Sequence, residues 1–194
     1  MLATENLTLH PPANYELSDE WFFELCAANR ELHIERTASG EIVIMPPTGG
    51  DTGYQNSKLS FQLELWNRRT KLGATFDSST GFRLPNGANR SPDASWLPKE
   101  QWDSLSPAQR KRFLPLSPLF AIELRSSTDT LKTLRAKMRE YLENGTELGW
   151  LIDPFGKFVE VYRPDAEVVV LRDVRVVSAD PVLPGFELEL DDIF

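Results

Sequence analysis

The stretch PLFAIELRSS, residues 118–127, places a carboxylate inside an apolar strand. Leu119 to Leu124 is almost continuously apolar, a pattern typical of a strand buried on both faces. Glu123 interrupts this run, and Arg125 follows two residues later on the same face of the predicted strand. Because burying an unpaired carboxylate costs several kcal/mol, we expect Glu123 to have a partner.

Length and composition predict one soluble domain. The 194 residues suffice for a single core, so we expect one domain over 1–194, with its core at about 18–190 and a loosely ordered N-terminal arm over 1–15. The sequence contains neither a secretory signal pattern nor an apolar run of the roughly 18 residues that span a membrane. Cys26 is the only cysteine, which excludes a disulfide framework and a cysteine-based metal site. These features predict a cytoplasmic protein.

The charge is acidic overall but unevenly distributed. A net charge of −8 argues mildly against a nucleic-acid binder, because phosphate contacts need positive potential. Basic residues nevertheless gather in RSSTDTLKTLRAKMR (125–139) and NRRTK (67–71), whereas acids gather in ELELDD (187–192). The basic strip is either a phosphate contact or a solvated helix face, and composition alone favours the solvated face.

Local patterns predict alternating helices and strands. In the N-terminal half we expect a helix over 18–30, a hairpin over 31–47, a Gly-rich turn over 48–54 and a helix over 55–71 that ends before Gly73. Further on we expect strands over 74–84, 93–97 and 119–125, a helix over 128–145, strands over 148–154 and 157–164, and a final strand within 176–194. Thr128 or Asp129 is the expected cap of the helix over 128–145, and Gly145 its stop. This order predicts a mixed sheet with helices packed against it.

Two acids lie in consecutive predicted strands. Asp93 begins one strand and Glu123 lies in the next, so neighbouring strands would bring both carboxylates to one sheet edge. Two carboxylates at so short a distance repel each other, and a cation between them removes the repulsion. With no thiolate pair and only two histidines, Mg²⁺ or Mn²⁺ suits the residues better than zinc. The alternatives are a turn role for Asp93 and an ion pair between Glu123 and Arg125 or another base.

The predicted helix over 128–145 carries a lysine at the flank of its apolar stripe. Lys137 can extend its ammonium to the sheet edge, although snorkelling into solvent is equally compatible with the spacing. Tyr141 lies beside it and could hydrogen-bond within a site, but a core position is favoured.

Four segments carry a family resemblance. They are RSPDASWLP (90–98), FAIELRSSTDTL (120–131), KMREYLENG (137–145) and LGWLIDP (148–154). Together they resemble the Uma family of restriction endonucleases, within the PD-(D/E)XK superfamily, from about residue 21 to 190. The resemblance implies a restriction-endonuclease-like α/β (α+β) fold, in which helices flank a mixed sheet and a helix and hairpin come first.

The resemblance also implies site residues. Asp93 matches the acid of the PD motif and Glu123 the second acid, so these two would hold Mg²⁺ or Mn²⁺. Arg125 stands where the motif lysine is usual, and Lys137 matches the lysine that this family keeps in the following helix. Because arginine does not give up a proton, Lys137 is the expected third catalytic residue.

Two further acids are weaker candidates. Members of the superfamily often take another acid from the first core helix, where Glu64 is the candidate by position. It points away from the apolar stripe of its helix, so a solvent-facing role is favoured. Glu35, on the polar face of the predicted hairpin, is the other.

The implied function is Mg²⁺-dependent hydrolysis of phosphodiester bonds in nucleic acid, with DNA favoured and a homodimer compatible with it. The resemblance assigns backbone contacts, weakly, to Arg125, Lys132, Arg135 and Arg139. One alternative is a catalytically degenerate nuclease fold that binds nucleic acid or a protein partner. Another is a structural protein with a buried salt-bridge network, and a two-carboxylate glycosidase is disfavoured because the tryptophans fit core positions.

Overall fold

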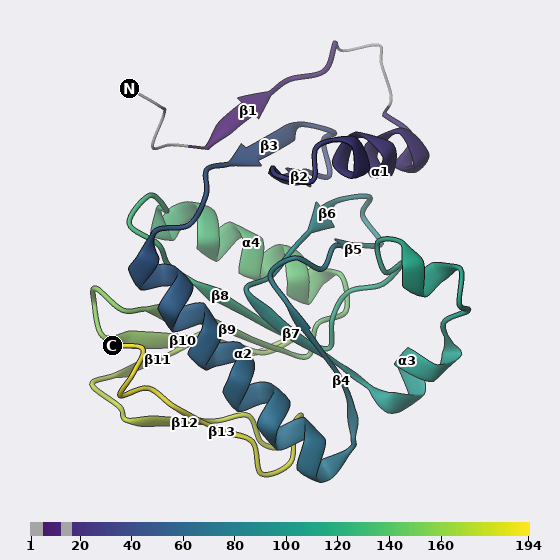
Figure 1. Ribbon diagram of the computed structural model, residues 1–194. Coiled ribbons are helices and arrows are strands. Elements are labelled where there is room, and N and C mark those ends of the chain that lie inside the picture. The colour runs from purple at the N-terminus through teal and green to yellow at the C-terminus, as the bar shows by residue number, and fades with distance from the viewer. Residues whose placement is uncertain (1–5, 13–16) are drawn as a thin grey trace.

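The computed structural model describes residues 6–12 and 17–194 (Figure 1). Its helices are α1 (Asp19–Ala28), α2 (Gly50–Thr70), α3 (Lys99–Ser104) and α4 (Leu131–Glu143), with a 3-10 turn η1 (Gln109–Lys111). Its strands are β1 (Leu7–Leu9), β2 (His33–Arg36), β3 (Ile42–Met45), β4 (Gly73–Asp77), β5 (Phe82–Arg83), β6 (Asn89–Arg90), β7 (Ala94–Pro98), β8 (Phe120–Leu124), β9 (Leu148–Asp153), β10 (Phe158–Tyr162), β11 (Val169–Arg172), β12 (Val176–Ser178) and β13 (Glu187–Glu189).

The central layer is a six-stranded mixed sheet with the strand order β11-β10-β9-β8-β7-β4. Strands β8 and β9 are parallel, and the other neighbours are antiparallel. A parallel pair needs a long crossover connection, which α4 supplies. Figure 1 shows α2 crossing in front of this sheet and α4 above it. The predicted mixed sheet flanked by helices is confirmed.

Strand β8 has a different environment on each face. Phe120, Ile122 and Leu124 belong to the core cluster formed with α2, β12 and β13. Ala121 belongs to the cluster formed with α4 on the opposite face. Because side chains alternate along a strand, Glu123 shares the α4 face with Ala121. The carboxylate is therefore directed at the helix that carries Lys137.

A glycine lets α4 pack closely on the sheet. A Cβ added at Gly149 in β9 would lie 2.3 Å from the terminal methyl of Met138 in α4. The flexible Met138 side chain would have to move to admit a larger residue, so Gly149 leaves room for Met138 between α4 and β9.

A second, five-stranded sheet has the order β1-β3-β2-β6-β5. Its β2–β3 hairpin packs against α1 through Phe22, Ile34 and Ile42. Helix α1 begins as predicted, because the Ser18 side chain accepts a hydrogen bond from the Trp21 N–H. In Figure 1 strands β1, β2 and β3 lie above α4, and ion pairs from Glu35 in β2 and Arg90 in β6 reach this helix.

Two boundaries near the Gly-rich segment differ from the prediction. Helix α2 begins at Gly50, within the segment 48–54 that we predicted to be a turn. Glycine is accepted at a helix start, and Asp51 in the first turn interacts favourably with the helix dipole. The helix ends at Thr70, and its C-cap Lys71 takes the left-handed conformation often supplied by a glycine, while Gly73 begins β4.

The other sequence boundaries were partly wrong. The predicted strand 74–84 is divided between β4 and β5, because the Asp77 carboxylate accepts the Ser79 N–H and turns the chain. The cap of α4 is Thr130. The side chain of the predicted cap Asp129 instead accepts the Ser126 N–H.

Part of the predicted loose arm over 1–15 is ordered. Residues Leu7–Leu9 form β1, which pairs with β3, because an edge strand offers unpaired backbone groups to a neighbouring segment. Positions 1–5 and 13–15 of the predicted arm lie outside the described residues. In the described ranges, no helix is both long and apolar enough to cross a bilayer.

Candidate active site

Strands β7 and β8 bring the two predicted acids together. Ala94 pairs with Ile122 in antiparallel register, which sets Asp93 opposite Glu123. Asp93 is held on both carboxylate oxygens. Oδ1 accepts a hydrogen bond of 2.8 Å from the Asn56 amide, and Oδ2 accepts one of 2.8 Å from the Leu124 N–H. The predicted convergence of the two acids at one sheet edge is confirmed.

Glu123 is almost fully buried, with 4% of the residue exposed. The Lys137 ammonium lies 3.0 Å from its Oε1, and the Tyr141 hydroxyl donates to the same oxygen over 2.9 Å. Burial outweighs the attraction of Lys137 and raises the pKa of Glu123 from 4.5 to about 8. Burial also raises the pKa of Asp93. Neither carboxylate therefore has enough positive charge nearby to offset the cost of its burial.

A third acid reaches the site from the hairpin. Glu35 in β2 is buried, and its Oε1 lies 2.8 Å from the Lys137 ammonium. It also contacts the Arg90 guanidinium at 3.0 Å and accepts the Ser91 N–H over 2.9 Å. Burial alone would raise its pKa, but the charges of Lys137 and Arg90 and these hydrogen bonds lower it to about 2. Glu35 is thus a stable buried anion.

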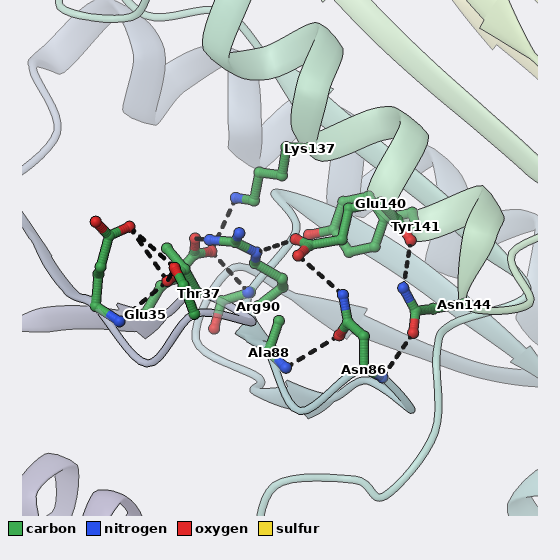
Figure 2. A network of polar contacts seen from close by, with 12 residues as sticks. Glu35, Thr37, Asn86, Ala88, Arg90, Lys137, Glu140, Tyr141 and Asn144 are labelled. Atoms are coloured by element: carbon green, nitrogen blue, oxygen red, sulfur yellow. Dashed lines mark hydrogen bonds and ion pairs between the residues drawn. The ribbon is translucent and has the colours of Figure 1, made fainter. Parts of the chain in front are cut away.

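Arg90 links this acid to α4 (Figure 2). Its Nε donates to Glu140 over 2.5 Å, while its other end contacts Glu35. The network continues through Asn86, whose amide donates to Glu140 and whose N–H donates to Asn144. The N-terminal hairpin, β6 and α4 are joined by these contacts, which fix where Lys137 can extend.

A pocket of about 920 Å³ opens beside these groups. Its lining combines the three acids with Arg90 and Lys137. It is completed by the first turn of α2, the segment 126–129, the β9–β10 turn and the C-terminal residues 191–194. The three acids therefore line a pocket and are not enclosed in the hydrophobic core.

The basic residues that we predicted to contact nucleic acid are partly engaged in ion pairs within the protein. Arg125 does not contact Glu123; it pairs with the buried Asp153 at 2.9 Å, because β8 ends at Leu124 and the chain turns there. Arg135 pairs with Glu160 at 2.5 Å. Lys132 and Arg139 are exposed on α4, and their contact with nucleic acid stays a prediction.

Glu64 lies outside the site, as its place on the helix predicted. It accepts a hydrogen bond from Thr75 and lies 3.9 Å from Arg68 at the surface. Asn56, in the second turn of α2, is the residue of this helix that reaches Asp93. No pattern in the sequence singles out Asn56, since its contact depends on where α2 crosses β7.

A metal ion would have to be held by few protein groups. Within residues 6–12 and 17–194, no three His, Cys, Asp or Glu side chains converge in a way that could hold an ion. Asp93 and Glu123 nevertheless offer hard oxygen ligands. They suit Mg²⁺, which commonly takes one or two carboxylates and completes its shell with water and substrate phosphate.

Comparison with known proteins identifies the family. A sequence profile described as "Putative restriction endonuclease", the Uma2 family, matches residues 19–191. The chain belongs to this family. The resemblance seen in the sequence is thereby confirmed.

Among solved structures, the Uma2 chain described here is similar to a crystal structure titled as a putative nuclease belonging to DUF820 from Anabaena variabilis ATCC 29413. The two share 20% identity with a TM-score of 0.71, over 84% of this chain and 89% of that one. At this identity the likeness shows a common fold. No curated protein matches the chain.

Proposed function

We propose that this protein is a divalent-metal-dependent nuclease that hydrolyses phosphodiester bonds, with DNA as the favoured substrate. One observation carries the proposal: Asp93 lies opposite Glu123 across two strands, with the Lys137 ammonium 3.0 Å from Glu123, at the wall of an open pocket. Membership of the Uma2 family supports a nuclease, and the metal and the substrate are inferred from the residues.

The chemistry of the acids favours a cation between them. Burial raises the pKa of both Asp93 and Glu123, so their anionic forms lack compensation in the metal-free protein. Mg²⁺ or Mn²⁺ would supply that charge and, when bound, would polarise the scissile phosphate and lower the pKa of an attacking water.

The protein's own groups would orient the reactants. Lys137 would donate to the attacking water or to a phosphate oxygen, where developing negative charge needs stabilisation. Asn56 and the Leu124 N–H hold the Asp93 carboxylate in one orientation. Glu35 acts as a positioning residue, since it holds the Lys137 ammonium from the opposite sheet.

The test is calorimetric titration with Mg²⁺ and with Mn²⁺ at low salt, followed by a cleavage assay on single- and double-stranded DNA and RNA. We expect saturable metal binding that is lost in Asp93→Asn and Glu123→Gln and kept in the matched surface variant Glu64→Gln. Metal-dependent cleavage should disappear in the same two variants and in Lys137→Met.

A non-catalytic scaffold is the second candidate, because Lys137 is already paired with both glutamates and Arg125 with Asp153. Since a substrate phosphate can complete a metal shell, the titration is repeated with a short oligonucleotide present, both single-stranded and as a duplex. No metal binding under either condition would favour this scaffold and contradict the nuclease.

A further inference from the structure

An aromatic side chain stands exposed at the edge of the candidate active site. Phe155 lines the same pocket as Asp93 and Glu123, and 62% of it is accessible to solvent. Scattered exposed apolar residues are common, but one at the mouth of a polar pocket is a candidate for ligand contact.

The turn that carries Phe155 is tightly held. The buried Asp153 carboxylate accepts the Phe155 N–H over 2.9 Å and the Gly156 N–H over 3.1 Å. A Cβ added at Gly156 would lie 2.5 Å from the Phe158 ring, so the turn is packed directly on the core. The exposure of Phe155 is therefore set by a rigid turn.

A cation accompanies the ring. The Arg125 guanidinium, anchored by Asp153, lies 5.3 Å from the centre of the Phe155 ring. Tyr54 of α2 lines the same pocket and is also exposed, with the Lys58 ammonium 5.0 Å from the centre of its ring. Exposed rings combined with nearby cations are the means by which proteins bind unpaired nucleic-acid strands, through base stacking.

The negative charge of the pocket favours binding of a single strand, which can place an uncharged base there, over binding of a duplex, which brings a second phosphate backbone. Carboxylates dominate the lining: Glu35, Asp51, Asp93, Glu123, Asp129, Glu140, Asp191 and Asp192, against the permanent cations Arg90 and Lys137. A rigid duplex would bring two phosphate strands to this acidic surface, and the repulsion would oppose binding. A single strand can approach the metal with one phosphate and place an uncharged base on the ring.

We propose that Phe155 is a stacking platform for an unpaired base, so that the substrate is single-stranded or locally unpaired nucleic acid. This inference rests on the nuclease proposed above and specifies its substrate class. Tyr54 is placed to stack a second base from the α2 side of the pocket.

The experiment uses a short single-stranded oligonucleotide with one 2-aminopurine, and the same strand annealed as a duplex. Binding to the full-length protein is followed by fluorescence quenching and anisotropy with Ca²⁺, an oxygen-liganded ion like Mg²⁺, so that the readout does not depend on cleavage. The variants are Phe155→Ala and Phe155→Trp. Phe61→Ala is the matched control, because Phe61 is 63% exposed on α2 and does not line the pocket.

We expect Phe155→Ala to weaken single-strand binding about 5- to 150-fold, the range for losing one stacked base. Phe155→Trp should retain affinity and quenching, and Phe61→Ala should match the wild type. Equal affinities of Phe155→Ala and wild type would overturn the inference. So would equal losses in Phe155→Ala and Phe61→Ala, duplex binding at least as tight as single-strand binding, or no binding of either probe.

The two proposals fail separately. Metal-dependent cleavage that is indifferent to Phe155→Ala would overturn the stacking platform and leave the nuclease intact. Phe155-dependent binding by a wild-type protein that shows no metal-dependent cleavage would overturn the nuclease and leave a single-strand-binding site.

Discussion

Two buried glutamates approach one lysine from different sheets, yet their acidities diverge. Glu35 comes from the hairpin sheet and lies 2.8 Å from the Lys137 ammonium, whereas Glu123 comes from the central sheet and lies 3.0 Å from it. The pKa of Glu35 is lowered to about 2, and that of Glu123 is raised to about 8. Burial and the shared cation are common to both, so other neighbours must make the difference.

Glu35 has a second cation beside it, whereas Glu123 has further acids nearby. Glu35 also has the Arg90 guanidinium and a backbone N–H, which compensate its burial. Glu123 has a neutral hydroxyl and the nearby charges of Asp93 and Glu35, which oppose ionisation. A buried acid whose neighbours supply enough positive charge is a structural anion. A buried acid whose neighbours do not supply it is a candidate ligand for an added cation.

Removing the structural anion should have the largest effect on stability. Glu35→Ala leaves Lys137 and Arg90 without a shared partner, and we expect the free energy of unfolding to fall by about 3–5 kcal/mol. Urea unfolding near pH 7 measures it, with the exposed Glu31→Ala as control. Because the pKa of Glu35 is lowered from 4.5 to about 2, its contribution is complete above pH 4.5 and is lost as the pH falls through 2. A loss below about 1 kcal/mol would contradict the distinction drawn between the two glutamates.

Neutralising Glu123 should raise the free energy of unfolding, which is the opposite of the effect expected at Glu35. Between pH 4.5 and about 8 the folded protein keeps a proton on Glu123 that the unfolded chain releases, so wild-type stability falls as the pH rises through this window. We expect metal-free Glu123→Gln to be more stable than wild type by about 4 kcal/mol at pH 8, and nearly equal to it at pH 4.5. Chemical unfolding in EDTA across this range tests the difference. A loss of several kcal/mol would instead indicate a purely structural salt bridge.

The tyrosine beside Glu123 should matter less. Tyr141→Phe removes one buried hydrogen bond to Glu123 and should cost about 1 kcal/mol of unfolding free energy, with weaker Mg²⁺ binding. Tyr162→Phe is the matched control, because its hydroxyl donates to Glu160 and not to a site acid. It should lose comparable stability with unchanged Mg²⁺ affinity. Equal Mg²⁺ affinities in the two variants would exclude a role for Tyr141 in holding Glu123.

The smallest effect is expected at the acid outside the site. Glu64→Ala should change the free energy of unfolding by less than about 0.5 kcal/mol and leave metal binding unchanged, because its contacts are exposed. Thermal unfolding and calorimetry check both. Reduced metal affinity here would mean that the first core helix contributes a ligand after all.

The fold could be predicted where local patterns were strong. The apolar β8 and β9 and the amphipathic α4 between them follow from periodicity, and their order implies the parallel pair. The start of α2 was mispredicted because its glycines resemble a turn, and the helix is stabilised there by Asp51 and by packing further along. Strand β1 was missed, since its exposed residues form a strand only when β3 offers a free edge.

Only part of the candidate site could be predicted, because local patterns report some of its residues and not others. Asp93, Glu123 and Lys137 lie on elements whose register and periodicity can be read locally, and the family motif marked them. Glu35 was underestimated because alternation assigns it to the polar face of a hairpin. That face is buried only when α4 and β6 cover it, and no local pattern reports this covering.

Local sequence was therefore enough to predict most of the element order and the family, and to single out Asp93, Glu123 and Lys137 as candidates. The folded chain was needed to show that Glu35 joins them, that Arg125 turns away to Asp153, and that the two glutamates ionise differently. Periodicity acts over neighbouring residues, whereas burial and electrostatic compensation depend on groups far apart in the chain. For that reason the charge state of the site follows only from how the two sheets close over α4.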